Sequence, residues 1–269
     1  MLPAEREQKI ISYLTKYKTA SVHTLAKEFN VHDATIRRDL VKLEQYNQIR
    51  RTHGGVVLNN ENVYSELNFD ERQTEYYYEK LGIGYKAAEF VEDGDTLIID
   101  SGSTTLLFAK ALLHKQHLTI ITNDIHIASI LRSSNHKVIV TGGTLYHNNY
   151  VLNGLITTQT LQSFNSMKAF LATPAIDAIK GVTHYSEEFV DAKRQMVNQS
   201  KEVYMLTDSS KLNKIAFYQV CPIHKITALI TDHHEDIHEY KKTIPNVIAV
   251  NPKAVSYTHL RAHETDSYL

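Results

Sequence analysis

This sequence of 269 residues is poor in several features that define common classes of protein. Cys221 is its only cysteine, which excludes an internal disulfide and a cysteine-rich metal site. No apolar run reaches the roughly 18 to 20 residues that cross a bilayer. The fifteen histidines include no pair in a zinc-binding spacing such as HExxH. We therefore expect no membrane partner, no metal and no other cofactor.

The first thirty residues also lack the apolar core of a secretory signal, so we expect a cytoplasmic protein. With 42% hydrophobic and 22% charged residues, the composition is that of a folded protein, and its length allows two domains. Residues 1–58 contain ten Lys and Arg against six Asp and Glu, a net charge of +4, so the remainder carries −5. A basic segment attached to an acidic body indicates a polyanion partner for that segment.

Three stretches of the basic segment have apolar residues at helical spacing. The first helix starts near Pro3, a residue that suits a first turn. The second has Ser21 as its N-cap and ends at Asn30, and the third starts near Asp33, a further N-cap residue. The residues expected on the buried sides are Ile10, Leu14 and Tyr17, then Val22, Leu25, Ala26 and Phe29, and finally Ile36, Leu40 and Leu43.

Two adjacent arginines lie on the outer side of the third predicted helix. At about 100° per residue, Arg38 points almost directly away from the buried side, and Arg37 and Thr35 lie on the flanks. A helix, a short turn and an outward-facing arginine helix are typical of proteins that read the DNA major groove, where Arg can donate two hydrogen bonds to guanine. The alternative is that Arg37 pairs with Asp33 one turn earlier, or that both arginines are simply solvated.

Residues 49–58 predict a β-hairpin, with Gly54 and Gly55 supplying the positive φ of its turn. Basic side chains on such a wing can lie along the duplex backbone. The residues expected to contact DNA are Ser21, His32, Thr35, Arg37, Arg38, Lys42, Arg50, Arg51 and His53. RNA is the weaker alternative, because RNA-binding modules favour exposed aromatic side chains for stacking and the arginine helix has none.

The stretch LAKEFNVHDATIRRDLVKLEQYNQIRRTHGGV resembles the winged helix-turn-helix domain of the DeoR family of bacterial transcription regulators. The hallmarks of that family are a TIRRDL recognition helix and a wing containing R-x-HGG. His32 stands where the family usually has serine, and Asp33 can take over the role of cap. The resemblance implies that residues 1–58 bind double-stranded operator DNA.

Residues 59–75 are polar with little periodicity and predict a linker between two domains. From residue 76 to 252, short β-branched runs alternate with helical segments. This pattern indicates a mostly parallel sheet covered on both faces, as in a Rossmann-like α/β domain. The runs are TLIID (96–100), LTIIT (118–122), KVIVT (137–141), KAFLAT (168–173), EVYMLT (202–207) and KITALIT (225–231).

Small, polar and charged residues follow these runs, and ligands of such sheets bind at the carboxyl ends of the strands. Hydroxyls and backbone N–H groups around Ser103 suit a phosphate, to which Lys211 can add a positive charge. Asp100 or Asp177 can accept hydrogen bonds from sugar hydroxyls. The residues expected to bind the effector are Asp100, Ser101, Gly102, Ser103, Thr104, Thr105, Asn123, Asp124, Gly142, Gly143, Asp177 and Lys211. Plain turn chemistry is the alternative for each loop taken singly.

The resemblance continues through DSGSTT, TND, TGGTLY, NG (153–154), KAFLATPAID, GVTHYSEE, KRQM (193–196) and TDSSK, in the order found in the effector domain of DeoR regulators. That domain is similar in fold to ribose-5-phosphate isomerase and typically senses phosphorylated sugars. Ala175, preceded by Pro174, stands where relatives usually have glycine. The resemblance implies a repressor of sugar metabolism or transport genes that a phosphorylated sugar releases. Because operators are commonly two-fold symmetric, we expect a homodimer or homotetramer.

An aldose–ketose isomerase acting on a sugar phosphate is the alternative function. It needs a carboxylate base such as Asp177, Glu187 or Glu188, with Lys180 nearby. A fold match alone does not indicate catalysis, and an isomerase has no use for a TIRRDL helix, so we expect no enzyme. Residues 253–269 lack periodicity and lie beyond the resemblance, and we expect them to be a non-native or disordered tail.

Overall fold

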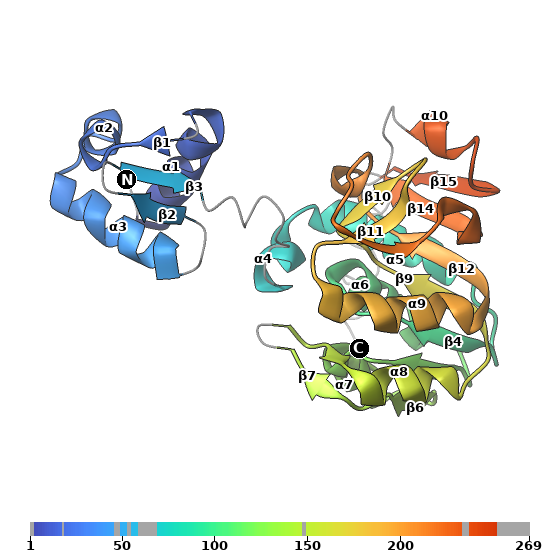
Figure 1. Cartoon of the computed structure of the whole chain (residues 1–269). Helices are drawn as coiled ribbons and strands as arrows, with labels where there is room; N and C mark the ends of the chain where they lie inside the picture. Colours follow the sequence, from blue (N-terminus) through green and yellow to red (C-terminus); the bar gives the residue numbers. More distant parts are fainter. Residues whose placement is uncertain are drawn as a thin grey trace, which may run out of the picture. The chain divides into compact units, whose positions relative to one another are not determined.

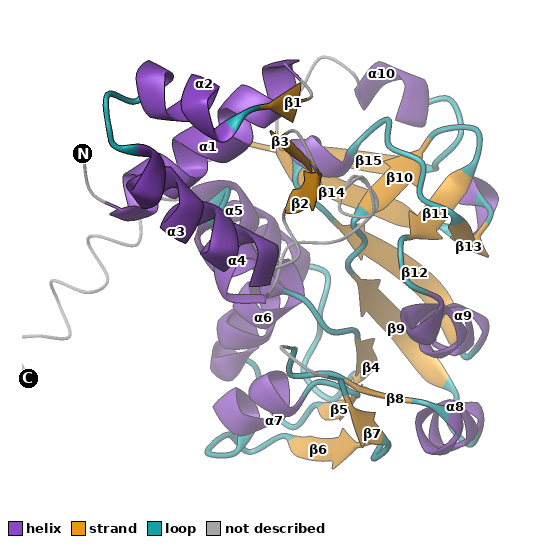
Figure 2. Ribbon diagram, turned by 60° about the vertical axis from the view of Figure 1, so that its left-hand side comes forward, coloured by secondary structure: helices purple, strands orange, loops and turns teal. Residues whose placement is uncertain are grey.

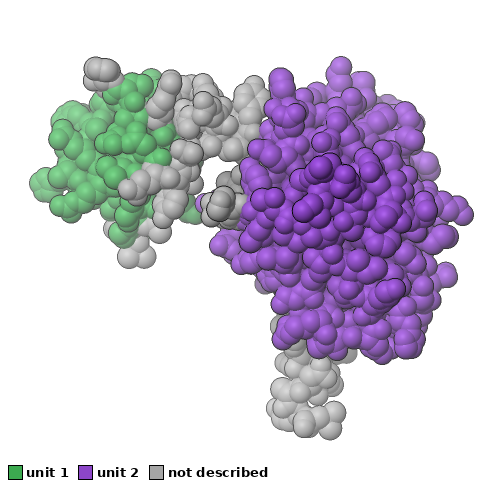
Figure 3. All heavy atoms as spheres, turned by 60° about the horizontal axis from the view of Figure 1, so that its bottom comes forward, with its two compact units in different colours: residues 1–66 green, residues 67–269 purple. Residues whose placement is uncertain are grey.

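The computed structural model describes residues 3–17, 19–45, 49–52, 55–58, 69–146, 149–232 and 237–251. The chain divides into two compact units, residues 1–66 and 67–269, which Figure 3 colours separately. His53, Gly54, residues 59–68 of the predicted linker and the predicted tail at residues 253–269 lie outside the described residues. Within the described ranges, no helix is both long and apolar enough to cross a membrane.

The first unit combines three helices with a small antiparallel sheet (Figure 1). Its elements are α1 (Pro3–Tyr17), β1 (Thr19–Ala20), α2 (Val22–Glu28), α3 (Asp33–Gln45), β2 (Ile49–Thr52) and β3 (Gly55–Leu58). The strands pair in the order β1-β3-β2, and Thr52 lies opposite Gly55 at the end of the β2–β3 hairpin. The predicted helices and the predicted hairpin are confirmed.

The core of the first unit consists mainly of residues that the helical spacing selected. Tyr17 is an exception, because it is 52% exposed at the end of α1, where its ring contacts that of Tyr13. The expectation that Tyr17 faces the core is therefore wrong. Asn30 has a φ of 51° and ends α2 as expected. The buried cluster contains Ile10, Leu14, Ala20, Leu25, Ala26, Ile36, Leu40, Leu43, Ile49 and Val56.

Two local expectations about turns are corrected by the structure. The N–H groups of Thr35 and Ile36 donate to the His32 carbonyl, at 2.8 and 3.3 Å, so the N-cap position is His32 and Asp33 is the first helical residue. Gly55 does not have a positive φ, because it is already the first residue of β3. Glycine is needed there for a different reason: a Cβ atom would collide with the Ala20 carbonyl oxygen.

A buried ion pair joins α1 to α3. Arg6 Nε lies 2.6 Å from Asp39 Oδ2, and a second guanidinium nitrogen donates to Asp39 Oδ1 at 3.1 Å. Both side chains are more than 90% buried. The two-pronged contact fixes the helix that carries the arginines against the helix behind it. Amphipathic patterning did not predict this pair, because it assigns charged residues to the outside.

The second unit is built on a seven-stranded parallel sheet in the order β15-β14-β12-β9-β4-β5-β6. The strands are β4 (Thr96–Ile99), β5 (Thr119–Thr122), β6 (Lys137–Val140), β9 (Ser166–Leu171), β12 (Ser200–Leu206), β14 (Ala228–Asp232) and β15 (Asn246–Val250). The six predicted runs correspond to six of these strands. The seventh, β15, is a half-exposed edge strand that the sequence analysis did not identify.

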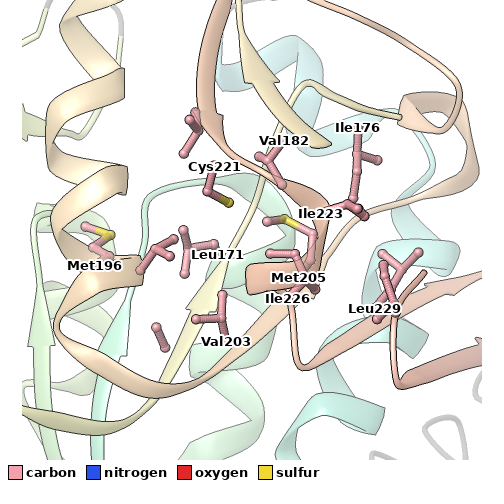
Figure 4. Close-up of a cluster of buried hydrophobic side chains, with 14 of the residues drawn as sticks. Leu171, Ile176, Val182, Met196, Val203, Met205, Cys221, Ile223, Ile226 and Leu229 are labelled. Atoms are coloured by element: carbon pink, nitrogen blue, oxygen red, sulfur yellow. The ribbon is translucent and has the colours of Figure 1, made fainter. Parts of the chain in front are cut away.

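Helices cover both faces of this sheet, as expected for an α/β domain (Figure 2). One face is covered by α5 (Tyr77–Ala88), α6 (Ser103–Ala111) and α7 (Ile125–Leu131), and the other by α8 (Leu155–Gln162) and α9 (Val190–Asn198). Successive residues of a strand enter opposite clusters: Leu97 and Ile99 face α5 and α6, whereas Ile98 faces the α9 side. Figure 4 shows part of the α9-side cluster, around Leu171, Met196 and Met205.

Shorter elements complete the unit. They are α4 (Phe69–Thr74), β7 (Thr144–Leu145), β8 (Leu152–Asn153), β10 (Ala175–Asp177), β11 (Gly181–His184), β13 (Tyr218–Cys221), α10 (Ile237–Tyr240) and the 3-10 turns η2 (Leu112–His114), η3 (Glu187–Phe189), η4 (Ser209–Lys211) and η5 (Ile223–Lys225). Strands β10, β11 and β13 form a separate antiparallel sheet that was not predicted. Helix α4 falls within the predicted linker, but Phe69 is buried in the second unit's core and fixes α4 there.

Candidate DNA-binding surface and effector site

The outer side of α3 presents the two neighbouring arginines. Arg37 and Arg38 are exposed, and neither side chain makes a hydrogen bond or ion pair with another described residue. Asp33 does not pair with Arg37, since its Oδ1 lies 3.7 Å from His23 Nδ1 instead. Ile36 and Leu40, on the opposite side of α3, are fully buried. The backbone therefore holds both guanidiniums toward solvent, as the helical spacing predicted.

The other expected DNA contacts differ in how available they are. Lys42 Nζ lies 3.4 Å from Glu7, and Arg51 Nε donates to Glu44 at 2.7 Å. The hydrogen bond with Arg51 lowers the pKa of Glu44. Ser21 is engaged as the N-cap of α2, where its hydroxyl accepts from Thr24 N at 3.0 Å. His32 is exposed, Thr35 is half-buried and Arg50 lies on β2.

The carboxyl ends of five neighbouring parallel strands, β12, β9, β4, β5 and β6, meet at one edge of the large sheet. Because these strands are adjacent and parallel, most loops that the sequence analysis selected lie together there. Residues 100–102 follow β4, Asn123 and Asp124 follow β5, Gly142 and Gly143 lie just beyond β6, and Lys211 closes η4 after β12. We call this edge the rim.

At the centre of the rim, Asp100 is fully buried and forms an ion pair with Lys193 of α9. Asp100 Oδ2 also accepts from Ala172 N at 3.1 Å, and Lys193 Nζ donates to the Ala172 carbonyl at 3.0 Å. The ammonium and the carboxylate thus hold the ends of β4 and β9 together. The sequence analysis missed Lys193, because its only signal was its place in the KRQM stretch, on a helix remote from the strand ends.

Asp124 is buried beside Asp100 and acts as the N-cap of α7. Its Oδ1 accepts from His126 N at 2.8 Å and from Ile127 N at 3.0 Å. Burial raises the pKa of Asp124 to about 6, chiefly by desolvating its carboxylate. Hydrogen bonds from the backbones of Ile127, His126 and Gly102 oppose this rise, and the charge of Asp100 adds to it. This carboxylate is therefore partly occupied by a structural role.

The first turn of α6 lies next to Asp100. Gly102 is its N-cap, and Ser103, Thr104 and Thr105 follow, all buried. The Thr105 hydroxyl donates to the Gly102 carbonyl at 3.0 Å. The first N–H groups of a helix have no acceptor inside it and carry partial positive charge, which favours an anion. Ser101 is half-buried at the opening of this turn.

Beyond β6, Gly143 packs against the β8 strand. It has a φ of 125°, and a Cβ atom there would lie 2.8 Å from the Asn153 carbonyl and collide with the Thr157 hydroxyl. Thr157 donates to the Gly142 carbonyl at 2.7 Å. Gly142 and Gly143 therefore let β8 and α8 approach the rim closely.

Positive charge lies at the other end of the rim, after β12. Lys211 is half-buried, and its side chain makes no hydrogen bond or ion pair with another described residue. Lys80 of α5 is buried, and its Nζ donates to the carbonyls of Arg72 and Glu75, at 2.5 and 2.7 Å. Burial chiefly lowers the pKa of Lys80; the charges of Lys211 and Arg72 act in the same direction, and Asp208 opposes them.

Asp177 lies near the residues that follow β12, because its neighbour Ile176 bridges to Leu212. It lies on β10, and its Oδ1 accepts from Ile179 N and Lys180 N, at 2.9 and 2.7 Å, closing the turn of the β10–β11 hairpin. Glu187, Glu188 and Lys180 are exposed. The described residues contain no cluster of three or more histidine, cysteine or acidic side chains suited to a metal ion.

A three-helix winged domain with a free arginine face, followed by an α/β domain with a polar rim, defines a class: transcription regulators that pair a DNA-binding module with a ligand sensor. The chain belongs to the DeoR family. Residues 6–62 match the family model described as the DeoR-like helix-turn-helix domain, and residues 75–233 match the DeoR C terminal sensor domain.

Relatives agree with this assignment over most of the chain. The sequence is 34% identical over 233 residues to an uncharacterized HTH-type transcriptional regulator, YulB, of Bacillus subtilis, covering 86% of this chain and 90% of the relative. It is 31% identical over 249 residues to a lactose phosphotransferase system repressor of Staphylococcus aureus, covering 91% and 98%. A ribose 5-phosphate isomerase A of Methanocaldococcus jannaschii aligns with a TM-score of 0.37 and 16% identity over 49% of this chain and 53% of that one, too weak a likeness to support a conclusion.

Proposed function

We propose that this protein is a sequence-specific DNA-binding repressor of genes for sugar metabolism or transport, and that a phosphorylated sugar bound in the second unit releases it from DNA. The observation that carries the DNA-binding half is the free, outward face of Arg37 and Arg38 on α3. Membership of the DeoR family and the relative named as a lactose phosphotransferase system repressor support the regulatory half.

In this proposal α3 enters the major groove, and Arg38 donates two hydrogen bonds to a guanine. Arg37, Thr35 and His32 flank it. Lys42, Arg50 and Arg51 contact phosphates, for which Lys42 and Arg51 exchange their Glu7 and Glu44 partners. Ser21 and His53 complete the set of proposed contacts, Ser21 at the start of α2.

The phosphate of the effector binds at the first turn of α6, where residues 101–105 supply hydroxyls and N–H groups, and Lys211 adds a positive charge. Asp100 and Asn123, on the β4 and β5 side, accept hydrogen bonds from the sugar. Asp124, Gly142 and Gly143 shape the loops. We omit Asp177 from this site, because its carboxylate already closes the turn of a separate hairpin.

Release follows from linkage: a sugar phosphate that prefers the arrangement unable to bind DNA lowers operator affinity by its differential affinity for the two arrangements. Two-fold symmetric operators favour a homodimer or homotetramer. A chromosomal partner implies that the protein works in the cytoplasm. We propose no catalytic role, since the carboxylates considered for an isomerase base are exposed or, in Asp177, committed to a turn.

The proposal is tested by selecting a binding sequence from random duplex DNA and then titrating phosphorylated sugars into the complex. Specific retention of one sequence, released by at least one sugar phosphate, is expected. Ser103→Asp places negative charge at the first turn of α6, so this variant should bind DNA normally and fail to respond. Absence of a selected sequence contradicts the DNA-binding half, and normal release by the Ser103→Asp variant contradicts the phosphate position.

A further inference from the structure

Three buried side-chain atoms near the ends of β4, β5 and β8 lack a hydrogen-bond partner among the described residues. They are Asp100 Oδ1, Asn123 Oδ1 and Asn153 Nδ2. The exposed fractions of these residues are 0%, 1% and 5%, so bulk water does not solvate them freely. Since buried polar atoms are almost always hydrogen-bonded, two acceptors and one donor together indicate a polar ligand.

The amide orientations are fixed by the backbone. Asn123 Nδ2 donates to the Leu152 carbonyl at 3.1 Å, and a carbonyl can only accept, so the Asn123 amide cannot be reversed. Asn123 Nδ2 also lies 3.4 Å from Asn153 Oδ1, which sets the orientation of the Asn153 amide in turn. The acceptor Asn123 Oδ1 and the donor Asn153 Nδ2 therefore remain for a ligand.

These residues belong to one corner of the rim. Leu152 N donates to the Asn123 carbonyl at 2.8 Å, and Val151 bridges to Asp124, so β8 lies against the end of β5. Ile99 and Thr122 are paired in the sheet, so Asp100 and Asn123, which follow them, lie side by side. Gly143 has no Cβ, which lets the Asn153 backbone approach.

The three unpartnered atoms of this corner suit hydroxyl groups better than phosphate oxygens. Asp100 and Asp124 are both buried there, and the one ammonium paired with them, from Lys193, is bound to Asp100 Oδ2. A hydroxyl group can donate to one acceptor and accept from a donor, whereas a phosphate dianion has no hydrogen to donate to Asp100 Oδ1 or Asn123 Oδ1. Lys211, at the β12 end of the rim, carries positive charge instead.

We propose that Asn153, together with Asn123 and Asp100, forms a hydroxyl-binding subsite that reads neighbouring hydroxyl groups of the effector. The hydroxyls donate to Asp100 Oδ1 and Asn123 Oδ1, and one of them accepts from Asn153 Nδ2. Lys193 is a positioning residue that occupies Asp100 Oδ2 and leaves Oδ1 for the ligand. This inference rests on the proposed effector site and deepens it: the ligand is a polyol phosphate whose hydroxylated part binds at the ends of β4, β5 and β8, beside the first turn of α6 that holds its phosphate.

The test is calorimetric titration of the full chain with ribose 5-phosphate, glucose 6-phosphate and fructose 6-phosphate, their free sugars, their monodeoxy analogues and inorganic phosphate. Asn153→Ala and Asn153→Asp remove the donor, and Asn198→Ala, on the exposed side of α9, is the matched control. Loss of one hydrogen bond predicts about tenfold weaker binding of the hydroxylated ligand by both Asn153 variants. Binding of inorganic phosphate should be unchanged, and one monodeoxy analogue should bind wild type and variants equally.

Equal affinity of wild type and the Asn153 variants for the hydroxylated ligand overturns the subsite, as does an equal loss for inorganic phosphate. A wild type that binds none of the hydroxylated compounds overturns it as well. Thermal unfolding of each variant shows whether it is folded. If Asn153→Ala does not fold, the near-isosteric Asn153→Asp variant still tests the subsite. Failure of the proposed DNA-binding function is seen in a different experiment, the selection from random duplex DNA, in which the wild-type protein would then retain no sequence.

Discussion

At the scale of the residue, the arginines of α3 illustrate how a functional side chain differs from a structural one. Lys42 and Arg51 each lie beside a glutamate, whereas Arg37 and Arg38 are held in solvent without a partner among the described residues. An exposed pair of like charges gains nothing for folding. In the proposed function these arginines bind a polyanion, which makes Arg38 the best single residue with which to test the surface.

Arg38→Ala should therefore weaken binding to the selected operator by about 1–3 kcal/mol and relax the preference at one base pair, because a bidentate contact to guanine is lost. Fluorescence anisotropy with the selected duplex and single-base variants measures both effects. Arg132→Ala, an exposed arginine of the second unit, is the control and should bind as wild type. Unchanged operator affinity for Arg38→Ala would disprove the groove assignment.

Asp124 links stability to pH. Burial raises its pKa to about 6 from an ordinary value of 3.8, so between these values the folded state binds a proton that the unfolded state has released. The free energy of unfolding should fall as pH rises through this window, by about 2–3 kcal/mol, because each pKa unit corresponds to about 1.4 kcal/mol.

Asp124→Asn keeps an N-cap side chain but cannot titrate. Urea denaturation between pH 4 and 7 measures the unfolding free energies of the variant and of wild type. As pH rises, the variant should become progressively more stable relative to wild type. Below about pH 4 the wild-type carboxyl is protonated and the difference should be smallest. A difference that does not vary with pH would show that Asp124 titrates normally.

At the scale of the element, the Arg6–Asp39 pair determines how firmly α3 is supported. Arg6→Ala leaves the Asp39 carboxylate buried without its guanidinium, which should cost about 2 kcal/mol or more in the stability of the first unit. Thermal unfolding followed by circular dichroism measures it. Lys9→Ala removes an exposed pair with Glu5 and should cost about 0.5 kcal/mol or less. Similar losses for the two variants would contradict the structural role of the buried pair.

In the proposed DNA-binding mode, Glu44 and DNA compete for Arg51 of the wing. Glu44→Gln removes a negative charge and releases the guanidinium, so binding to any duplex should become severalfold tighter and its salt dependence steeper by about one phosphate contact. Anisotropy titrations at several salt concentrations give both values. Glu239→Gln, which breaks an exposed pair with Lys242 in the second unit, is the matched control. A Glu44→Gln protein indistinguishable from wild type would place Arg51 outside the interface.

Elements differed in how well periodicity predicted them. The helical spacing of Ile36, Leu40 and Leu43 predicted α3, because a helix with one buried face has apolar residues at regular intervals. The continuous β-branched runs predicted the central strands, because these strands are buried on both faces. The antiparallel sheet and α4 escaped this reasoning. The strands of the antiparallel sheet, with the sequences AID, GVTH and YQVC, mix apolar residues with small or polar ones and contain no β-branched apolar run. Helix α4 is fixed mainly by one buried residue, Phe69.

At the scale of the whole molecule, the proposed regulation makes a quantitative prediction. The factor by which a saturating sugar phosphate weakens operator binding must equal the factor by which saturating operator weakens sugar-phosphate binding. Anisotropy gives the first factor and calorimetry on the preformed complex gives the second. Arg38→Ala should bind the sugar phosphate as the free wild type does. Unequal factors would mean that the sugar phosphate and DNA do not act on one shared equilibrium.

The sequence by itself determined the two-part organisation, the helix that carries the arginines, the central strands and the loops after them. These follow from the spacing of apolar residues and from local turn chemistry, which involve neighbours in the chain. Only the tertiary structure brought Lys193 to Asp100, Asn153 to Asn123 and Arg6 to Asp39. Such pairs join residues far apart in the sequence, and which of them meet depends on how strands order and how helices pack, which no local pattern records.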